Sequence, residues 1–335
     1  MEQLKTLSLF SGCGGMDLGV LGGFNYLGRT YNKLPTEIVY AMDIDPYAAN
    51  IYNSNFKHKC NVEDIKTTCE KSLPDHDLLI GGFPCQSFSI IAQNPPRLGI
   101  KDEKGELFFE ICRILKEKKP RFFIAENVKG ILSANKKQAF PLIIKNFENS
   151  GYYVKYKLLN SSEFGIPQKR ERVFIVGFRN IEDYNAFSFP EEITLENKVS
   201  LEVALEEKID DKYYFSDRAV EGMKKAKKHM NKGRAQDIKQ PCNTISAHLS
   251  KVSLNSTDPV LIENGKYRRF TPREAARIQS FPDNFILNSV SEGRQYKAIG
   301  NAVPPALMWY ITNSLIAIVT DDNKLNQLNI IKKAS

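Results

Sequence analysis

The chain has 335 residues, 42% of them hydrophobic and 26% charged, so it can bury one large core or two domains and lacks the composition of a disordered protein. Lysine and arginine (47) outnumber aspartate and glutamate (39), and the net charge of +8 favours a polyanionic partner such as nucleic acid. The six cysteines include no CxxC pair and no stretch reaches transmembrane length, so we expect a cytoplasmic protein with no disulfide scaffold, metal site or membrane partner.

The first predicted element is a buried strand at residues 7–10, which a glycine-rich turn and a helical pattern follow. This order is typical of a nucleotide-binding domain, because glycines let backbone N–H groups approach a ligand and a helix N-terminus favours an anion. The glycine spacing differs from GxGxxG, which disfavours a dinucleotide. The alternative is that the glycines only permit tight packing.

Acidic residues follow the next two predicted strands. Asp43 closes the strand at residues 37–42, where an acid is placed to bind ribose hydroxyls. Asp45 is placed to cap the helix that comes next. Asp64 follows a third strand around residues 59–62, where it could accept a hydrogen bond from an exocyclic amine such as that of adenine, or be a solvated loop acid.

A cysteine follows the buried strand at residues 77–80 and a turn of two glycines. Open α/β sheets place ligands and chemistry at this end of a strand. Pro84 fixes its own φ and biases Phe83 towards extended conformations, so the approach to Cys85 is stiff, which suits a nucleophile. The alternative is that Cys85 is a small buried hydrophobic residue. The polar residues 90–105 are typical of a mobile loop, and we expect them to close over the nucleophile.

A second reactive residue type stands at another strand end. Glu126 follows a predicted strand at residues 121–125, and a carboxylate beside a buried run is costly unless it is partnered or functional. The basic residues within 165–172 could bind phosphates or carboxylates, or pair with surface acids. Further core elements are predicted at residues 106–119, 138–149, 153–159 and 172–178.

The pattern weakens after about residue 180 and predicts a smaller second domain. Residues 223–239 are densely basic, as in a solvated face or a segment that follows a phosphate backbone. Thr271 is placed to cap a helix with Pro272 in its first turn and Glu274 three residues on. We expect the last apolar helix, residues 306–319, to return to the sheet of the first domain.

In this order the motifs resemble those of the bacterial cytosine-5 DNA methyltransferases, the modification half of restriction–modification pairs. The matching segments are Phe10-Ser11-Gly12-Cys13-Gly14-Gly15, Asp43, Asp64-Ile65, Phe83-Pro84-Cys85-Gln86, Glu126-Asn127-Val128, Gln168-Lys169-Arg170-Glu171-Arg172, Arg273 to Pro282 and Gly300-Asn301. They leave residues 181–267 uncovered. Two departures are Ile44, where relatives often carry an aromatic residue against the cofactor adenine, and the segment Ala302-Val303-Pro304-Pro305.

The resemblance implies an α/β fold, with a Rossmann-like S-adenosylmethionine-dependent methyltransferase domain and a smaller target-recognition domain. The catalytic domain would comprise residues 1–180 completed by 295–335, and residues 181–294 would form the recognition domain and hinge. The implied cofactor contacts are Phe10, Ser11, Gly12, Gly14, Gly15, Asp43, Ile44, Asp64, Ile65, Pro84, Leu107, Asn301 and Ala302. The implied contacts to duplex DNA are Gln86, Ser87, Arg97 and Thr244. We expect a monomer.

The resemblance also implies the chemistry. The Cys85 thiolate would add to carbon 6 of cytosine, which turns the ring into an enamine that attacks the methyl group of S-adenosylmethionine. Glu126 would hold and protonate N3, and Arg172 together with Arg170 would bind the ring carbonyl. The cytosine must be flipped out of the duplex, with the loop 86–104 closing over it. The base that removes the carbon-5 proton is not assigned, and water is one candidate.

Two other functions fit parts of this pattern. An RNA cytosine-5 methyltransferase of the tRNA-modifying branch would carry the same catalytic set, but the long basic insertion between Gly177 and Arg268 favours DNA. A catalytically silent DNA-binding regulator with this fold is disfavoured because Cys85, Glu126 and Arg172 are all present.

Overall fold

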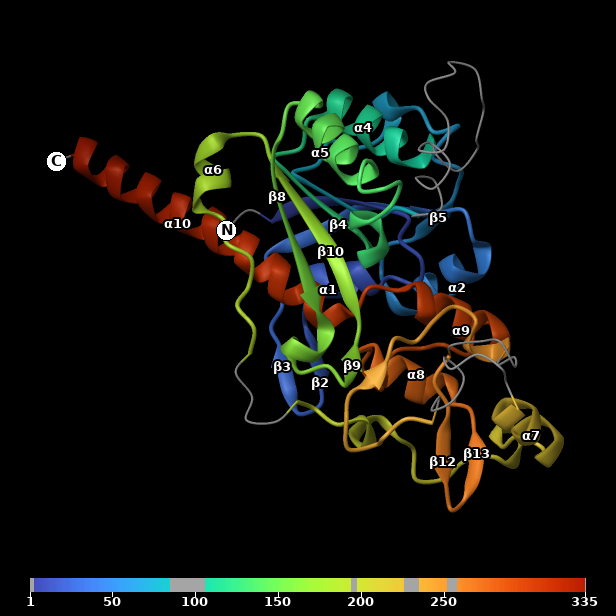
Figure 1. Ribbon diagram of the computed structural model, residues 1–335. Coiled ribbons are helices and arrows are strands. Elements are labelled where there is room, and N and C mark those ends of the chain that lie inside the picture. The colour runs from blue at the N-terminus through green and yellow to red at the C-terminus, as the bar shows by residue number, and fades with distance from the viewer. Residues whose placement is uncertain (1–2, 85–105, 194–197, 226–234, 252–257, 335) are drawn as a thin grey trace.

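The computed structural model describes residues 3–84, 106–193, 198–225, 235–251 and 258–334, and these residues form a central seven-stranded sheet (Figure 1). Across the sheet the strand order is β5 (Cys60–Val62), β4 (Thr36–Asp43), β1 (Leu4–Leu9), β6 (Leu78–Gly82), β7 (Phe122–Val128), β10 (Glu171–Phe178) and β8 (Tyr153–Asn160). β10 pairs antiparallel with both of its neighbours, whereas the pairs from β5 to β7 are parallel. The first residues of β10 therefore lie at the same edge as the last residues of β1, β4, β6 and β7.

Helices cover both faces of the sheet. One face packs against α4 (Glu106–Lys118) and α5 (Ala139–Asn149), and the other against α1 (Gly15–Leu21), α2 (Pro46–Asn55) and α10 (Pro305–Ala334). Because side chains alternate along a strand, Leu79 of β6 enters the first apolar layer while Leu78 and Ile80 enter the second. Such near-continuous apolar runs are what a sheet buried on both faces requires.

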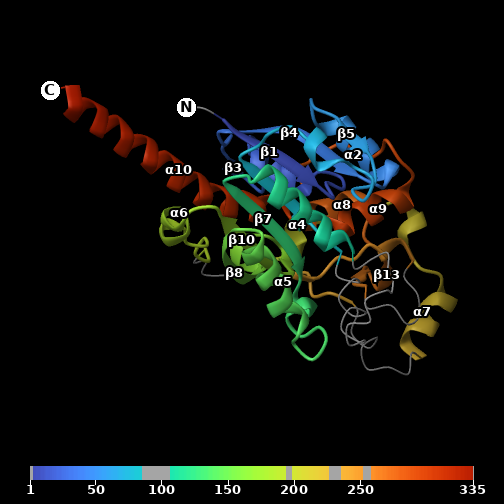
Figure 2. The ribbon, with the colours of Figure 1, turned by 90° about the horizontal axis from the view of Figure 1, so that it is seen from above.

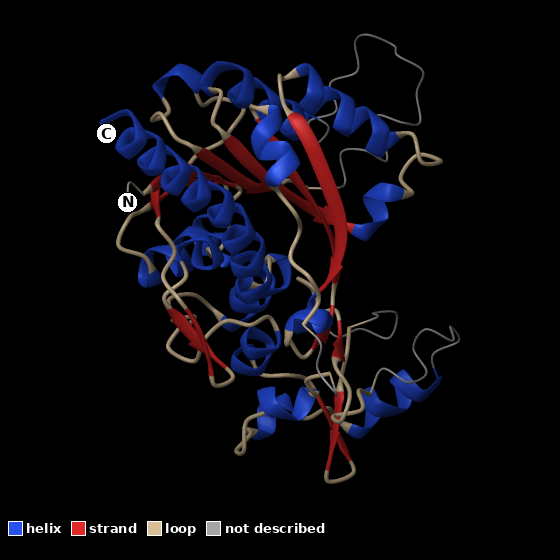
Figure 3. Cartoon of the chain, turned by 90° about the vertical axis from the view of Figure 1, so that its left-hand side faces the viewer, coloured by secondary structure: helices blue, strands red, loops and turns tan. Residues whose placement is uncertain are grey.

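A smaller lobe lies beside the carboxyl edge of the sheet (Figure 3). Its elements are α7 (Asp217–Lys225), β11 (Cys242–Asn243), β12 (Leu261–Glu263), β13 (Lys266–Arg268), α8 (Pro272–Ile278) and α9 (Glu292–Asn301). Short 3₁₀ turns lie at Glu70–Ser72, Lys129–Leu132, Ser161–Phe164, Leu201–Ala204, Asp211–Tyr213 and Leu249–Lys251. The lobe has its own apolar cluster, which reaches Cys13 and Ile51 of the sheet domain.

The start of α8 follows the predicted cap. Thr271 accepts a hydrogen bond from the N–H of Glu274, and the Glu274 carboxylate accepts one from the N–H of Thr271, which completes a capping box with Pro272 in the first turn. Glu274 also pairs with Arg268 at 2.8 Å, and both side chains are fully buried. The cap thus doubles as the counter-charge of a buried arginine in the smaller lobe.

Several elements were not predicted from the sequence. The hairpin of β2 (Phe24–Tyr26) and β3 (Arg29–Tyr31) and the short helix α6 (Ile181–Ala186) are too brief for a periodic signal. The two-residue strand β9 (Gln168–Lys169) exists only because it pairs with β11. β7 continues beyond the predicted end through Glu126 to Val128, because β10 pairs with it along this whole length.

The stretch Glu292–Thr320 is long and apolar enough to cross a membrane by length and composition, but 67% of its most apolar window is buried within the protein. Residues of α10 from Ala306 to Ile318 belong to the apolar layer shared with α1 and the sheet. The stretch therefore packs as part of the protein core, and the last turns of α10 extend away from the body (Figure 2).

Candidate active site

A cleft of about 440 Å³ opens at the carboxyl edge of the sheet. Segments far apart in the sequence meet there: the glycine turn after β1, the acidic end of β4, the turn after β6, the end of β7, the start of β10 and the loop after α9. The predicted site residues that line it are Phe10, Ser11, Gly12, Gly15, Asp43, Ile44, Pro84, Glu126, Arg170, Arg172, Asn301 and Ala302. The structure thus brings the two arginines and Glu126 into one space with most of the predicted cofactor residues.

Other predicted residues do not line this cleft. Gly14 faces the rings of Phe56 and Tyr52, and Ile65 and Leu107 belong to the apolar layer under α4. The side-chain oxygen of Asp64 accepts a hydrogen bond from the N–H of Lys66. The hydroxyl of Thr244 donates to the carbonyl of Lys169 at 2.8 Å. Cys85, Gln86, Ser87, Arg97 and the predicted closing loop 86–104 lie outside the described residues.

The glycine turn is held by Asp43. Its carboxylate accepts hydrogen bonds from the N–H groups of Gly12 and Asp45, both at 2.8 Å, so it ties the turn after β1 to the start of α2. Phe10 and Gly12 adopt left-handed backbone conformations, with φ of 54° and 56°. A left-handed phenylalanine at a strand end is the kind of local strain that collects at functional sites. Burial raises the pKa of Asp43, while the two backbone donors oppose the shift.

The mouth of the cleft combines an apolar surface with charge. Ile44 is 67% exposed beside Asp43 and presents an apolar side chain to the cleft. Asp45 caps α2 as predicted and also pairs with Lys297 of α9 at 2.7 Å. This ion pair joins two parts of the cleft wall, the start of α2 and α9, that are far apart in the sequence.

Glu126 and Arg172 form an ion pair on the floor of the cleft. The Nε of Arg172 lies 3.0 Å from Oε1 of Glu126, and both side chains are nearly buried. Antiparallel pairing sets this distance, because Arg172, the second residue of β10, pairs with Val128 of β7. Gly82 leaves room for the carboxylate, since a Cβ there would lie 3.3 Å from Oε2 of Glu126.

Burial controls the titration of this pair. It raises the pKa of Glu126 above its ordinary value, while the charges of Arg172 and Arg170 act in the opposite direction. Burial also lowers the pKa of Arg172, and Glu126 counteracts that shift. A carboxyl group with a raised pKa in a cleft is a candidate acid–base group, here with an arginine as its fixed neighbour.

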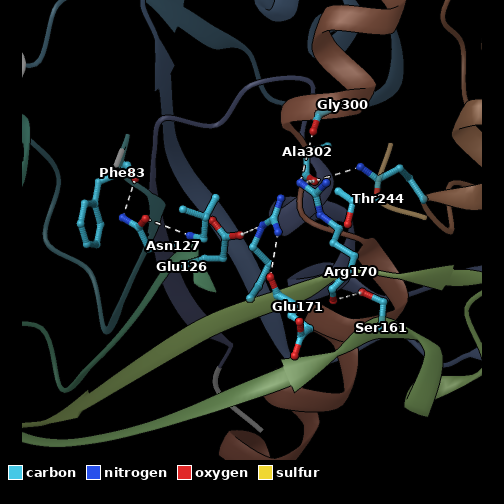
Figure 4. A network of polar contacts seen from close by, with 12 residues as sticks. Phe83, Glu126, Asn127, Ser161, Arg170, Glu171, Thr244, Gly300 and Ala302 are labelled. Atoms are coloured by element: carbon cyan, nitrogen blue, oxygen red, sulfur yellow. Dashed lines mark hydrogen bonds and ion pairs between the residues drawn. The ribbon is translucent and has the colours of Figure 1, made fainter. Parts of the chain in front are cut away.

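Asn127 connects this pair to the turn that leads to Cys85. Its side-chain amide donates to the carbonyl of Phe83 at 2.9 Å, and its oxygen accepts from the N–H of Val128 (Figure 4). The segment Glu126-Asn127-Val128 thus holds the carboxylate and supports the neighbouring turn at once.

Arg170 is 2% exposed and reaches across the back of the cleft. Its terminal nitrogens donate to the carbonyls of Ile245, Gly300 and Ala302 at 2.9–3.2 Å (Figure 4). Its Nε has no hydrogen-bond partner among the described residues. The guanidinium therefore ties the smaller lobe to the loop after α9 at the rim of the site.

Sequence reasoning missed some residues of the cleft. Lys297 and Val303 line it, although the prediction covered only Asn301 and Ala302 of this segment. The adjoining Gly300 was the available signal, because a glycine at the end of a helix often marks a close backbone approach. The carbonyl of Val303 would lie 2.3 Å from a Cβ at Gly15, so the two loops touch.

Larger clefts, of about 610, 600 and 530 Å³, lie along residues 206–295 of the smaller lobe, beside the β2–β3 hairpin and around Tyr152 and Arg179. None of these three contains a predicted site residue. Within the described ranges, no group of three or more His, Cys, Asp or Glu side chains is placed to hold a metal ion.

Residues 4–317 match the family model of the C-5 cytosine-specific DNA methylases. The chain belongs to this family. It is 37% identical to the type II methyltransferase M1.ScrFI of Lactococcus lactis subsp. cremoris, over 96% of this chain and 80% of that protein. It is 36% identical to M.Bsp6I of Bacillus sp. (strain RFL6), over 90% of this chain and 95% of that protein. This DNA methylase therefore methylates carbon 5 of cytosine in DNA, as the resemblance of its motifs predicted.

Solved structures agree with the fold. The S. pombe Dnmt2 methyltransferase superposes with a TM-score of 0.75 at 23% identity, covering 94% of this chain and 98% of that one. A putative DNA modification methyltransferase encoded within an E. coli prophage superposes with a TM-score of 0.69 at 22% identity, covering 95% of this chain and 100% of that one. The predicted α/β methyltransferase fold is confirmed. The family match favours DNA cytosine methylation over both the RNA methyltransferase and the catalytically silent regulator.

We expect Arg172→Met to raise the pKa of Glu126 further, because the substitution removes the nearest positive charge and the charged carboxylate loses its partner. The measurement is a carboxyl titration by ¹³C NMR with labelled glutamate, in which Glu126→Gln identifies the signal. Lys129→Met is the matched control, because Lys129 pairs with Glu171 on the surface at 2.8 Å and should leave Glu126 unchanged. A pKa of Glu126 that stays constant or falls in Arg172→Met would contradict the pairing.

Proposed function

We propose that this methylase modifies a cytosine flipped out of a short specific duplex sequence, and that it protects DNA from a cognate restriction endonuclease. The observation that carries the proposal is the cleft itself, in which the Glu126–Arg172 pair shares about 440 Å³ with the glycine turn and Asp43. The methyl donor and the cytosine must lie in the same cleft for the transfer, and this cleft carries groups suited to bind each of them. The family match and the similarity to type II methyltransferases support a role in restriction–modification.

The proposed cofactor is S-adenosylmethionine, which supplies an electrophilic methyl group when bound. Asp43 would accept from the ribose hydroxyls, and the exposed side chain of Ile44 would contact the adenine face. The left-handed Gly12 lines the cleft and lets the backbone approach a ligand closely, which fits a nucleoside. Asn301 and Ala302 would close the amino-acid end, and Asp64 and Ile65 would contact adenine.

In the proposed mechanism Cys85 adds to carbon 6 of the flipped cytosine. Its thiolate forms the new carbon–sulfur bond while electrons move towards N3, where Glu126 supplies a proton. Arg172 donates to the ring carbonyl and keeps Glu126 oriented, with Arg170 behind it. Carbon 5, now nucleophilic, would take the methyl group from the sulfonium of S-adenosylmethionine, which would leave as S-adenosylhomocysteine. Loss of the carbon-5 proton then restores the double bond and expels Cys85.

We propose that residues 1–180 with 295–335 form the catalytic domain and that residues 181–294 form the recognition domain and hinge. The pairing of β9 with β11 supports this arrangement, because it places residues 242–244 of the recognition domain beside the strand that leads to Arg172. Thr244 would contact DNA from this position, together with Gln86, Ser87 and Arg97. We infer a monomer that works in the cytoplasm, where its duplex substrate is found.

Purified protein with labelled S-adenosylmethionine should transfer methyl groups to duplex DNA and not to tRNA. On duplexes with 5-fluorocytosine at the target it should form a stable adduct, because fluorine cannot leave as a proton does. Cys85→Ala should form none, while a Cys69→Ala control, at an exposed cysteine outside the cleft, should behave like the wild type. Transfer to tRNA alone, or an adduct that persists in Cys85→Ala, would refute the proposal.

Asp43→Ala should weaken S-adenosylmethionine binding by about 1.5–3 kcal/mol, the usual contribution of a hydrogen bond to a charged group. DNA affinity should change little. Isothermal calorimetry measures the first and fluorescence anisotropy the second. Glu63→Gln is the control, since this exposed acid accepts from Tyr40 outside the cleft. Equal cofactor affinity in Asp43→Ala and the wild type would remove Asp43 from the binding site.

Exchanging residues 181–267 for the equivalent segment of a relative should move methylation to the sequence that the relative recognises. Cofactor affinity should stay within a few-fold, because the segment contributes no lining residue to the cleft. Methylome sequencing of cells that express each protein gives the target. A folded, active chimera that still methylates the original sequence would place recognition elsewhere.

A further inference from the structure

Three buried polar side chains form a hub behind the cleft: Gln168, Arg170 and Gln279. Their exposed fractions are 0%, 2% and 0%. Gln168 is the first residue of β9, Arg170 follows that strand, and Gln279 follows α8. The amide of Gln168 donates to the side-chain oxygen of Gln279 at 2.7 Å, so two distant segments meet through their side chains.

The hub holds the peptide groups of Ile245 from both sides. The side-chain oxygen of Gln168 accepts from the N–H of Ile245 at 2.9 Å, and Nη1 of Arg170 donates to its carbonyl at 3.1 Å. Just before it, β11 pairs with β9, and the hydroxyl of Thr244 donates to Lys169. Residues 242–245, in the proposed recognition domain, are thus attached to the segment that leads to Arg172.

The hub also holds the loop that closes the cleft. The amide of Gln279 donates to the carbonyl of Ile299 at 2.8 Å and more weakly to that of Ala302, which also accepts from Arg170. A Cβ at Gly300 would lie 2.2 Å from the backbone of Ser246, so the recognition segment and this loop are in direct contact.

These contacts leave little freedom for independent movement. A buried amide that loses its hydrogen-bond partner costs the full desolvation free energy of the group, and the side chains of Gln168 and Gln279 are fully buried. If residues 242–247 shift, the hub keeps its hydrogen bonds only when residues 299–303, the end of α9 and the loop after it, move as well. These residues include Asn301 and Ala302 on the wall of the cleft.

We propose that Gln279 is a positioning residue through which DNA bound at residues 243–247 changes the affinity of the cofactor pocket. The inference rests on the proposed function and deepens it: DNA and cofactor bind cooperatively, and the coupling passes through the amide of Gln279. Because binding linkage is reciprocal, cofactor must strengthen DNA binding by the same factor.

Equilibrium dialysis with tritiated S-adenosylhomocysteine tests this, with and without a saturating duplex that carries the site found by methylome sequencing. The wild type should bind the nucleoside at least about 5-fold more tightly with DNA, the lower end of typical coupling. Gln279→Leu removes both the acceptor for Gln168 and the donor to Ile299. The ratio should then lie within about 2-fold of one, because the side chain no longer connects the two segments. Gln279→Glu keeps the acceptor for Gln168 but loses the donor to Ile299, and should do the same.

Thr312→Val is the matched control. Thr312 is fully buried and donates to Met308 within α10, so its loss lowers stability without touching the hub. This variant should keep the wild-type ratio. In the wild type, DNA should also slow amide hydrogen exchange in residues 298–303, a measurement that needs no variant.

A wild-type ratio near one, an unchanged ratio in a folded Gln279 variant, or unaltered exchange in residues 298–303 would each overturn the inference. An equal loss of coupling in Thr312→Val would do so too, because it would trace the effect to stability. These outcomes leave the proposed function intact as long as the wild type transfers methyl groups to DNA, whereas a wild type that transfers none would refute the proposed function itself.

Discussion

The direction of β10 is the constraint on which the cleft depends. Because β10 runs antiparallel to β7, Arg172 at its start lies beside Glu126 near the end of β7. A parallel strand of the same eight residues would carry Arg172 to the opposite edge of the sheet, more than about 20 Å away. The remaining walls then follow from the parallel strands, whose ends all reach the same edge.

The buried charges at this edge of the sheet are stabilised by their contacts with one another and with main-chain carbonyls. A buried carboxylate or guanidinium alone costs several kcal/mol of desolvation, about as much as the whole margin of stability of many domains. Glu126 and Arg172 offset this cost through their contact at 3.0 Å, and Arg170 through three main-chain carbonyls. The burial that makes these charges costly also raises the pKa of Glu126, which is the direction that the proposed role as a proton donor requires.

Packing between loops joins chain segments that local sequence cannot relate. The glycine at position 15 touches the carbonyl of Val303, and Gly300 lies against the backbone of Ser246. Lys297 reaches Asp45 across the same opening. Lys297 lies outside the matching motifs, and the motif that contains Gln279 does not show what Gln279 contacts, because each residue acquires its partner only when the smaller lobe folds onto the sheet domain.

The sequence by itself determined the strand–turn–helix order, the acid after β4, the glutamate at the end of β7 and the cap of α8, because each depends on the propensities and spacing of neighbouring residues. The tertiary structure decided which of these residues share a cleft. Asp64 and Ile65 carry the same motif signal as Asp43, and Leu107 was expected beside them, yet all three lie outside the lining of the cleft, and Ile65 and Leu107 belong to the apolar layer under α4. The β9–β11 pairing and the hub of Gln168, Arg170 and Gln279 were likewise invisible, because hydrogen bonds between residues about 75 to 130 positions apart form only once the whole chain has folded.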